Sequence, residues 1–119
     1  MNINRLPIGE KDGTSLSVEY NNLDEADTSP AAIEIPEFAD RSVQVVGTFN
    51  GGTVVIEGSN DGTNFVTLTD PQGNALSITT ARLEQIQELT RFIRPRVSAG
   101  TGVDVDVFFV LRRASSIRT

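Results

Sequence analysis

The chain has 119 residues, which is the length of one domain, and 38% of them are hydrophobic. Its 10 basic and 16 acidic side chains leave a net charge of -6, which argues against a nucleic-acid partner because phosphate contacts need clustered Lys and Arg. Histidine and cysteine are absent, which excludes cysteine nucleophiles, histidine-containing triads, disulfide scaffolds and the usual zinc and iron–sulfur sites. We expect no membrane partner, since no apolar run is long enough to span a bilayer and residues 1–13 lack the apolar segment of a signal peptide.

The N-terminal part of the chain is predicted to be an extended acidic arm. Residues 1–60 hold 3 basic and 10 acidic side chains, and the acid is densest in residues 19–40, which contain two prolines and no base. Such a stretch cannot pack a core by itself and is expected to run over the surface, although a strand is expected near residues 16–20. We therefore divide the chain into an acidic arm (1–41), a β-rich core (42–113) and a C-terminal tail (114–119).

From Ser42 the hydrophobic pattern acquires a period of two, which is typical of strands. Four short strands are predicted, at residues 42–49, 53–58, 64–69 and 74–80. The turn sequences between them are Asn50-Gly51-Gly52, Ser59-Asn60-Asp61-Gly62 and Asp70-Pro71-Gln72-Gly73. Because Asn-Gly between two β-rich runs is a strong hairpin signal, we expect the four strands to form an antiparallel meander.

The C-terminal half adds a predicted helix and two further strands. Residues 81–89, ARLEQIQEL, are good helix formers with Thr80 as a possible N-cap, and they predict a short helix at one end of a sheet. Residues 91–100 return to an extended pattern, in which Pro95 belongs at a sheet edge or a bulge because it has no N–H to donate. Residues 102–113, GVDVDVFFVLRR, form the clearest strand, with one wholly apolar face.

These elements together predict an all-β fold. Seven or eight short strands at spacings of roughly ten residues favour an antiparallel β-sandwich or jelly roll. The prediction is completed by one short helix and by the extended N-terminal arm.

Three groups of residues have both a chemical and a structural interpretation. Asp104 and Asp106 form an acid pair of the kind used in glycoside hydrolysis, but an alternation of Val with Asp is typical of a solvated sheet face. Asn60, Asp61 and Asn64 offer oxygens to a calcium ion, but Asn-Asp-Gly is also a ready turn sequence. The glycines at 51–52 and 100–102 precede strands and lack the Lys-Ser/Thr signature of a phosphate cradle. We expect the structural interpretation each time, and so assign no enzyme activity, catalytic residue, cofactor or metal.

The end of the last strand is a candidate interface. Beyond Asp106 its second face becomes Phe108 and Val110, so the helix, a loop or another subunit is expected to cover it. The chain also has nine arginines and one lysine, and arginine suits bidentate pairing with carboxylates at interfaces. The arginines predicted to lie at an interface are Arg91, Arg94, Arg96, Arg112 and Arg113. The acidic segment 19–40 is their natural complement, within one chain or across a subunit boundary.

Three consecutive stretches resemble small virion proteins of tailed bacteriophages. They are GSNDGTNFVTLTDPQGNALSITT (58–80), ARLEQIQELTRFIRPRV (81–97) and SAGTGVDVDVFF (98–109), within a similarity that covers about residues 42–113. The resemblance implies a β-sandwich or jelly roll that decorates or cements the capsid, without a cofactor. It also implies a homo-dimer or homo-trimer that binds the major capsid protein on the virion surface after assembly in the host cytoplasm.

One of these stretches also resembles a second kind of protein. The run GSNDGTNF taken alone is similar to the strand-turn-strand of discoidin-like sugar-binding modules, with Phe65 in place of Trp. The alternative function is therefore that of a tail- or fibre-associated β-sandwich that binds host surface carbohydrate. This alternative predicts a surface groove around residues 59–65.

Overall fold

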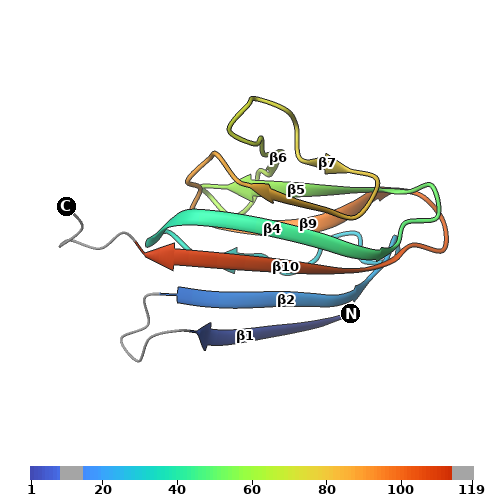
Figure 1. Ribbon diagram of the computed structural model, residues 1–119, viewed down its shortest axis with the longest axis horizontal. Coiled ribbons are helices and arrows are strands. Elements are labelled where there is room, and N and C mark those ends of the chain that lie inside the picture. Colours follow the sequence, from blue (N-terminus) through green and yellow to red (C-terminus); the bar gives the residue numbers. More distant parts are fainter. Residues whose placement is uncertain (9–14, 114–119) are drawn as a thin grey trace.

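The computed structural model describes residues 1–8 and 15–113, which form two antiparallel β-sheets around one core (Figure 1). Sheet A contains, in spatial order, β1 (Asn2–Ile8), β2 (Ser15–Leu23), β10 (Asp104–Arg113), β4 (Phe38–Thr48) and β8 (Arg82–Gln85). Sheet B contains β3 (Ile33–Glu34), β9 (Phe92–Ala99), β5 (Thr53–Ser59) and β6 (Val66–Thr67), while β7 (Ser77–Ile78) pairs with β5. The predicted all-β antiparallel class is confirmed.

The core lies between the two sheets and is built by strict alternation along the strands. The apolar face predicted for residues 102–113 is buried throughout, at Val103 just before β10 and at Val105, Val107, Phe109 and Leu111 on β10. Tyr20 of β2 packs edge-on against Phe109, with ring centroids 5.9 Å apart, and its hydroxyl donates to the Ala31 carbonyl over 2.6 Å. Burial raises the pKa of the Tyr20 phenol far above its usual value, so the hydroxyl remains a neutral donor.

The acidic N-terminal third contributes to the core and is not a surface arm. β1 and β2 are strands of sheet A, and the predicted boundary between residues 41 and 42 falls inside β4. The buried apolar residues of this region are Leu16, Val18, Tyr20, Leu23, Ile33, Ile35 and Phe38. The expectation that residues 19–40 run over the surface is therefore wrong, because carboxylates such as Glu19 alternate with inward-facing apolar positions. The strand predicted near residues 16–20 is confirmed, and the tail 114–119 lies outside the described residues.

The Asn50-Gly51 turn forms but does not join two strands of one sheet. Asn50 and Gly51 have φ angles of 49° and 77°, yet β4 belongs to sheet A and β5 to sheet B. The predicted meander is therefore wrong at its first link, because both edges of β4 are taken by β10 and β8. Gly52 is required at this crossing, since a Cβ atom there would lie 2.6 Å from the Val103 side chain and 2.7 Å from the Ala99 carbonyl oxygen.

The two later turns connect strands as predicted. β5 pairs with β6 across the loop at 60–65, and Thr69 bridges Ala75 around the turn at 70–73. Pro95 lies on β9 opposite Ile56, beyond the short stretch at Phe92 and Ile93 where β3 pairs with the other edge. Among the described strands, β9 therefore has a partner at Pro95 on one side only, which agrees with the expected edge position.

Residues 81–89 do not form the predicted helix. Residues 82–85 are strand β8 and pair with β4, after which the Ile86 N–H donates to the Arg41 carbonyl over 2.9 Å. Of the expected apolar stripe only Ile86 is buried, while Leu83 and Leu89 are 64% and 62% exposed. A helix of nine residues is not stable alone, whereas this segment satisfies its backbone groups along the open edge of β4. The described residues contain no helix.

Membrane-spanning helices are likewise not found in the described part of the chain.

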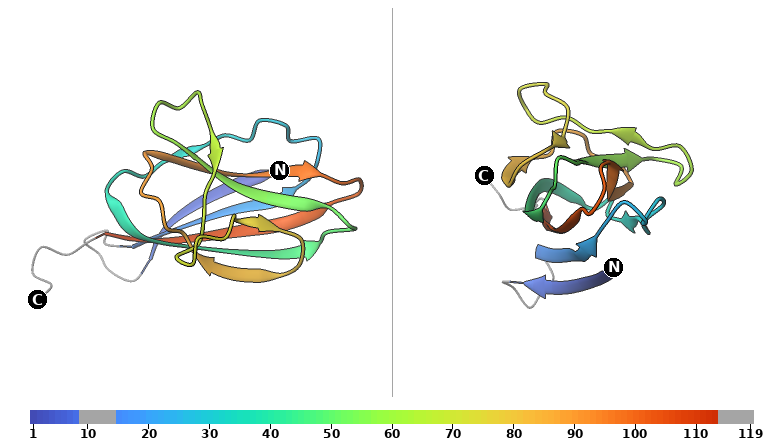
Figure 2. Two further views of the ribbon diagram at one scale, coloured as in Figure 1. Left: turned by 90° about the horizontal axis from the view of Figure 1, so that it is seen from above. Right: turned by 90° about the vertical axis from the view of Figure 1, so that its right-hand side faces the viewer.

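In the end-on view β1 lies at one margin of the molecule, away from β5 and β6 (Figure 2). Sheet A thus presents a broad surface that runs from β1 at one edge to β8 at the other.

A buried arginine closes one end of the two-sheet structure. Arg41 is 2% exposed and extends inward from β4. Its Nε donates to the Phe38 carbonyl over 2.7 Å, and its Nη2 donates to the carbonyls of Ile35 and Thr90 over 3.0 and 2.7 Å. Its Nη1 donates to the Glu88 carbonyl and to the Thr90 hydroxyl. Burial lowers the pKa of Arg41, but a guanidinium remains charged at neutral pH.

Replacement of Arg41 by Ala is expected to lower the free energy of unfolding by about 3–5 kcal/mol, because several carbonyls lose their donor at the end of the core. Arg41→Lys should also destabilise the fold, since one ammonium cannot replace a five-bonded guanidinium. Urea unfolding followed by circular dichroism measures both effects. Arg5→Ala, at an exposed position of β1, is the control and should change stability by less than about 0.5 kcal/mol. An Arg41→Ala variant as stable as this control would contradict the assigned role.

Candidate functional site

The candidate site is the outer face of sheet A, formed by the side chains that alternate with core positions and point away from sheet B. The strand register aligns these side chains in rows across the sheet. One row is Leu83, Gln44, Phe108 and Glu19; the next is Gln85, Ser42, Val110 and Ser17; a third is Asp40, Arg112 and Ser15. The first two of these rows, the central rows, thus place Leu83, Phe108 and Val110 among polar neighbours, of which only Glu19 is charged.

Apolar side chains of this face remain exposed on β8 and β10. Leu83 is 64% and Val110 is 38% exposed, while Phe108 and Val46 are partly buried. The sequence led us to expect that a helix, a loop or a subunit covers Phe108 and Val110. The predicted helix does not form, and the exposure of Val110 shows that no described segment of the chain covers it. The third cover that we expected, another subunit, lies outside the single chain of this structure.

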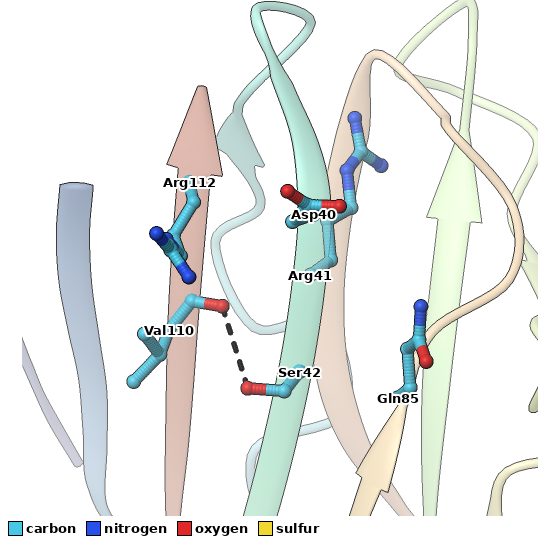
Figure 3. A pocket seen from close by; sticks show the side chains of 6 residues that line it. All are labelled: Asp40, Arg41, Ser42, Gln85, Val110 and Arg112. Carbon is cyan, nitrogen blue, oxygen red and sulfur yellow. Dashed lines mark hydrogen bonds between the residues drawn. The ribbon is translucent and has the colours of Figure 1, made fainter. Parts of the chain in front are cut away.

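A hollow of about 330 Å³ lies on the same face, beside Val110 (Figure 3). Its lining residues are Asp40, Arg41, Ser42, Gln85, Val110 and Arg112. Ser42 makes the hollow, because its short side chain stands between Val110 on β10 and Gln85 on β8 and its hydroxyl turns to the Val110 carbonyl. The outer face therefore has both a projecting apolar part and a recess.

The outer face is acidic at the start of β10, and near the end of β10 it carries Arg112 with Asp40 as the cross-strand neighbour. Asp104 and Asp106 occupy the first outward positions, and Arg112 occupies the last one. Both carboxylates accept hydrogen bonds from Asn22, which has a φ of 58° at an irregularity of the β2–β10 pairing. The Asp104–Asp106 pair lies on an open sheet face and not in the closed pocket that a catalytic pair needs.

Two of the arginines named from the sequence lie on the other side of the molecule, on the outer face of sheet B. Arg94 Nε and Arg96 Nη2 donate to the Glu57 carboxylate over 3.1 and 2.9 Å. Glu57 is 5% exposed. Burial alone would raise the pKa of Glu57, but the hydrogen bonds from Arg96 and Arg94 lower it overall. These two arginines therefore stabilise the sheet by holding a buried carboxylate.

Two further arginines pair with the acidic segment of the same chain. Arg91 binds Glu34 through its Nε, and Arg113 lies 3.8 Å from the Glu37 carboxylate. Both pairs are exposed, so each contributes little to stability. Of the five arginines, the structure places only Arg112 with Phe108 and Val110 on the outer face of sheet A.

The loop at 59–65 is closed by its own hydrogen bonds. Asp61 Oδ1 accepts from the backbone N–H groups of Thr63 and Asn64, both over 2.8 Å, and from the Ser59 hydroxyl. These bonds, those from the Asn64 and Thr63 backbone foremost, lower the pKa of Asp61 well below its usual range. The Arg94 guanidinium lies 3.9 Å from the Phe65 ring centroid. Within the described residues no group of three or more Asp or Glu side chains is arranged to hold a metal ion.

Comparisons with protein-family models, curated proteins and solved structures return no match. The outer face of sheet A must therefore be interpreted from its own residues. Sequence reasoning placed Phe108 and Val110 on one strand face but missed Leu83, because it assigned that residue to the apolar stripe of a helix. It also missed the contribution of Ser42 and Gln85, whose juxtaposition depends on the pairing of β8 with β4.

The Glu57 cluster predicts part of the acid sensitivity of the fold. Because the pKa of Glu57 in the folded chain lies below its ordinary value of 4.5, its stabilising effect is present above that value and is lost as the pH falls through the folded-state pKa. Glu57→Gln should be less stable than wild type at pH 7, and its stability should fall less steeply in acid. Urea unfolding between neutral pH and pH 3 measures both slopes. Glu37→Gln, in an exposed pair, is the control, and equal slopes for wild type and Glu57→Gln would refute the assignment.

Proposed function

We propose that this chain is a non-enzymatic structural protein of a tailed-phage virion, a β-sandwich of the capsid decoration type that binds the major capsid protein and stabilises the head. The observation that carries the proposal is the outer face of sheet A. Phe108 and Val110 lie at its centre on β10 and Leu83 lies on the edge strand β8, with Asp106 and Arg112 toward the two ends of β10. Contiguous apolar surface with a polar rim is typical of protein–protein contacts.

The resemblance of residues 58–109 to phage virion proteins supports this choice of class. A decoration protein performs no reaction, and its effect depends on the surface it buries. Each contact is repeated many times on a symmetric shell, so a modest affinity per copy becomes a high avidity. Strands between sheet neighbours are rigid, and a rigid surface loses little conformational entropy when it binds.

The alternative, a tail or fibre protein that binds host carbohydrate, would use the loop at 59–65. In that loop the Asp61 carboxylate is occupied by bonds within the chain, and Arg94 stacks on Phe65. The loop therefore offers fewer free groups to a sugar than the outer face of sheet A offers to a protein. We accordingly prefer the decoration role.

The proposal is tested by sedimentation with empty heads of the phage that encodes the chain. The purified protein is expected to sediment with the heads, to saturate at a fixed ratio to the capsid protein, and to raise the temperature at which the heads rupture. Leu83→Ser should weaken the uptake, because it removes apolar surface from the outer face of sheet A. Leu89→Ser is the matched control, since Leu89 is equally exposed but lies beyond β8.

Two results would count against the decoration role. A protein that remains in the supernatant with heads of that phage does not bind the capsid, and binding to a glycan array would then favour the carbohydrate alternative. Equal loss of uptake in Leu83→Ser and Leu89→Ser would show that the outer face of sheet A is not the surface involved.

A further inference from the structure

We infer that the outer face of sheet A binds a second copy of this chain, face to face across a two-fold axis. The inference rests on the proposed function of this face as a protein-binding surface, and it assigns the face to a second copy. Capsid binding then uses the remaining surfaces of the dimer, and its avidity depends on the two copies being held together. A two-fold contact is self-complementary, so that each residue meets a counterpart that receives the same contact in return. The outer face of sheet A satisfies this condition in both charge and shape.

When two copies of β10 are placed antiparallel, opposite charges lie next to each other. Asp106 precedes the apolar pair Phe108 and Val110, and Arg112 follows it, all on the same outer face. A two-fold axis that crosses β10 between Phe108 and Val110 sets the two β10 strands antiparallel. Phe108 then lies on Val110 of the second copy, and Asp106 lies beside Arg112 of the second copy. Each dimer thus contains two such ion pairs.

The same axis exchanges the two central rows of the outer face. Leu83 meets the aliphatic stem of Gln85, and Glu19 meets Ser17, so that no carboxylate faces another in these rows. The recess made by Ser42 lies beside Val110, where the Phe108 ring of the second copy arrives. The two-fold axis that pairs the opposite charges therefore also places the Phe108 ring against the recess at Ser42.

Other symmetric arrangements are less favourable. With the β10 strands parallel, Asp106 would lie next to Asp106 and Arg112 next to Arg112 of the second copy. With the axis through Phe108 itself, Glu19 would face Glu19. Because like charges in contact destabilise an interface, the charge pattern selects the antiparallel arrangement. A face-to-face contact of identical surfaces also closes after two copies, which favours a dimer over a trimer.

The size of the face is sufficient for a stable dimer. Sheet A has five strands, and β10 has ten residues. Strands about 4.8 Å apart and a rise of about 3.3 Å per residue give a face of roughly 24 by 33 Å, or roughly 600–800 Å² after allowing for the shorter β1 and β8. Stable interfaces bury about 800 Å² per partner.

A charge exchange between Asp106 and Arg112 tests the inference. Asp106→Arg and Arg112→Asp should each weaken the homodimer by about tenfold or more, because each places like charges in both ion-pair positions. A mixture of the two single variants should form a heterodimer, since both of its contacts then pair opposite charges. The double variant should form a homodimer again. Light scattering coupled to size exclusion gives the mass, and native mass spectrometry identifies the heterodimer.

Folding of each variant is checked by urea unfolding, because Asp106 also accepts a hydrogen bond from the Asn22 backbone. Leu83→Ser should weaken the homodimer without changing a charge, while Leu89→Ser should not. A wild-type chain that stays monomeric over the accessible concentration range overturns the inference, as does a dimer that the single charge variants leave intact. A monomer whose uptake by heads still depends on Leu83 would overturn the dimer and leave the decoration role standing. A dimer that does not sediment with heads would overturn the decoration role and leave the dimer standing.

Discussion

The architecture depends most on the hydrogen bonds that the buried Arg41 guanidinium donates. The partners of this guanidinium are neutral oxygens from Ile35 before β4, from Phe38 at the start of β4, and from residues 88–90 after β8. The main chain of Arg41 also receives the Ile86 N–H, so one residue holds both flanking segments against β4. A buried cation without its full set of acceptors is strongly unfavourable, and this requirement restricts the chain to conformations that supply those carbonyls.

That constraint explains why the outer face of sheet A is available. Residues that follow β8 are drawn inward, where Ile86 joins the core, and they do not fold back as a helix over Phe108 and Val110. β8 instead extends the sheet and adds Leu83 to its outer face. The segment expected to cover the apolar end of β10 thus enlarges the uncovered surface.

The two outer faces of the molecule differ in how their charges are used. On sheet B, Glu57 binds Arg94 and Arg96, and Arg94 also stacks on Phe65. On sheet A, Asp106 and Arg112 are separated along β10 by an apolar pair, with Asn22 bound to Asp106 and Asp40 opposite Arg112. The first arrangement favours the stability of the single chain, and the second favours binding to another protein surface.

The sequence by itself determined which residues share a strand face. Period-two alternation is a local property, so it correctly put the apolar face of β10 in the core and Phe108, Val110 and Arg112 together on the opposite face. Only the tertiary structure decided which strands pair, that β4 and β5 lie in different sheets, and that residues 82–85 form a strand. These outcomes depend on which sheet edges remain open and on where Arg41 finds its carbonyls. Such conditions involve residues far apart in the chain, which local patterns do not encode.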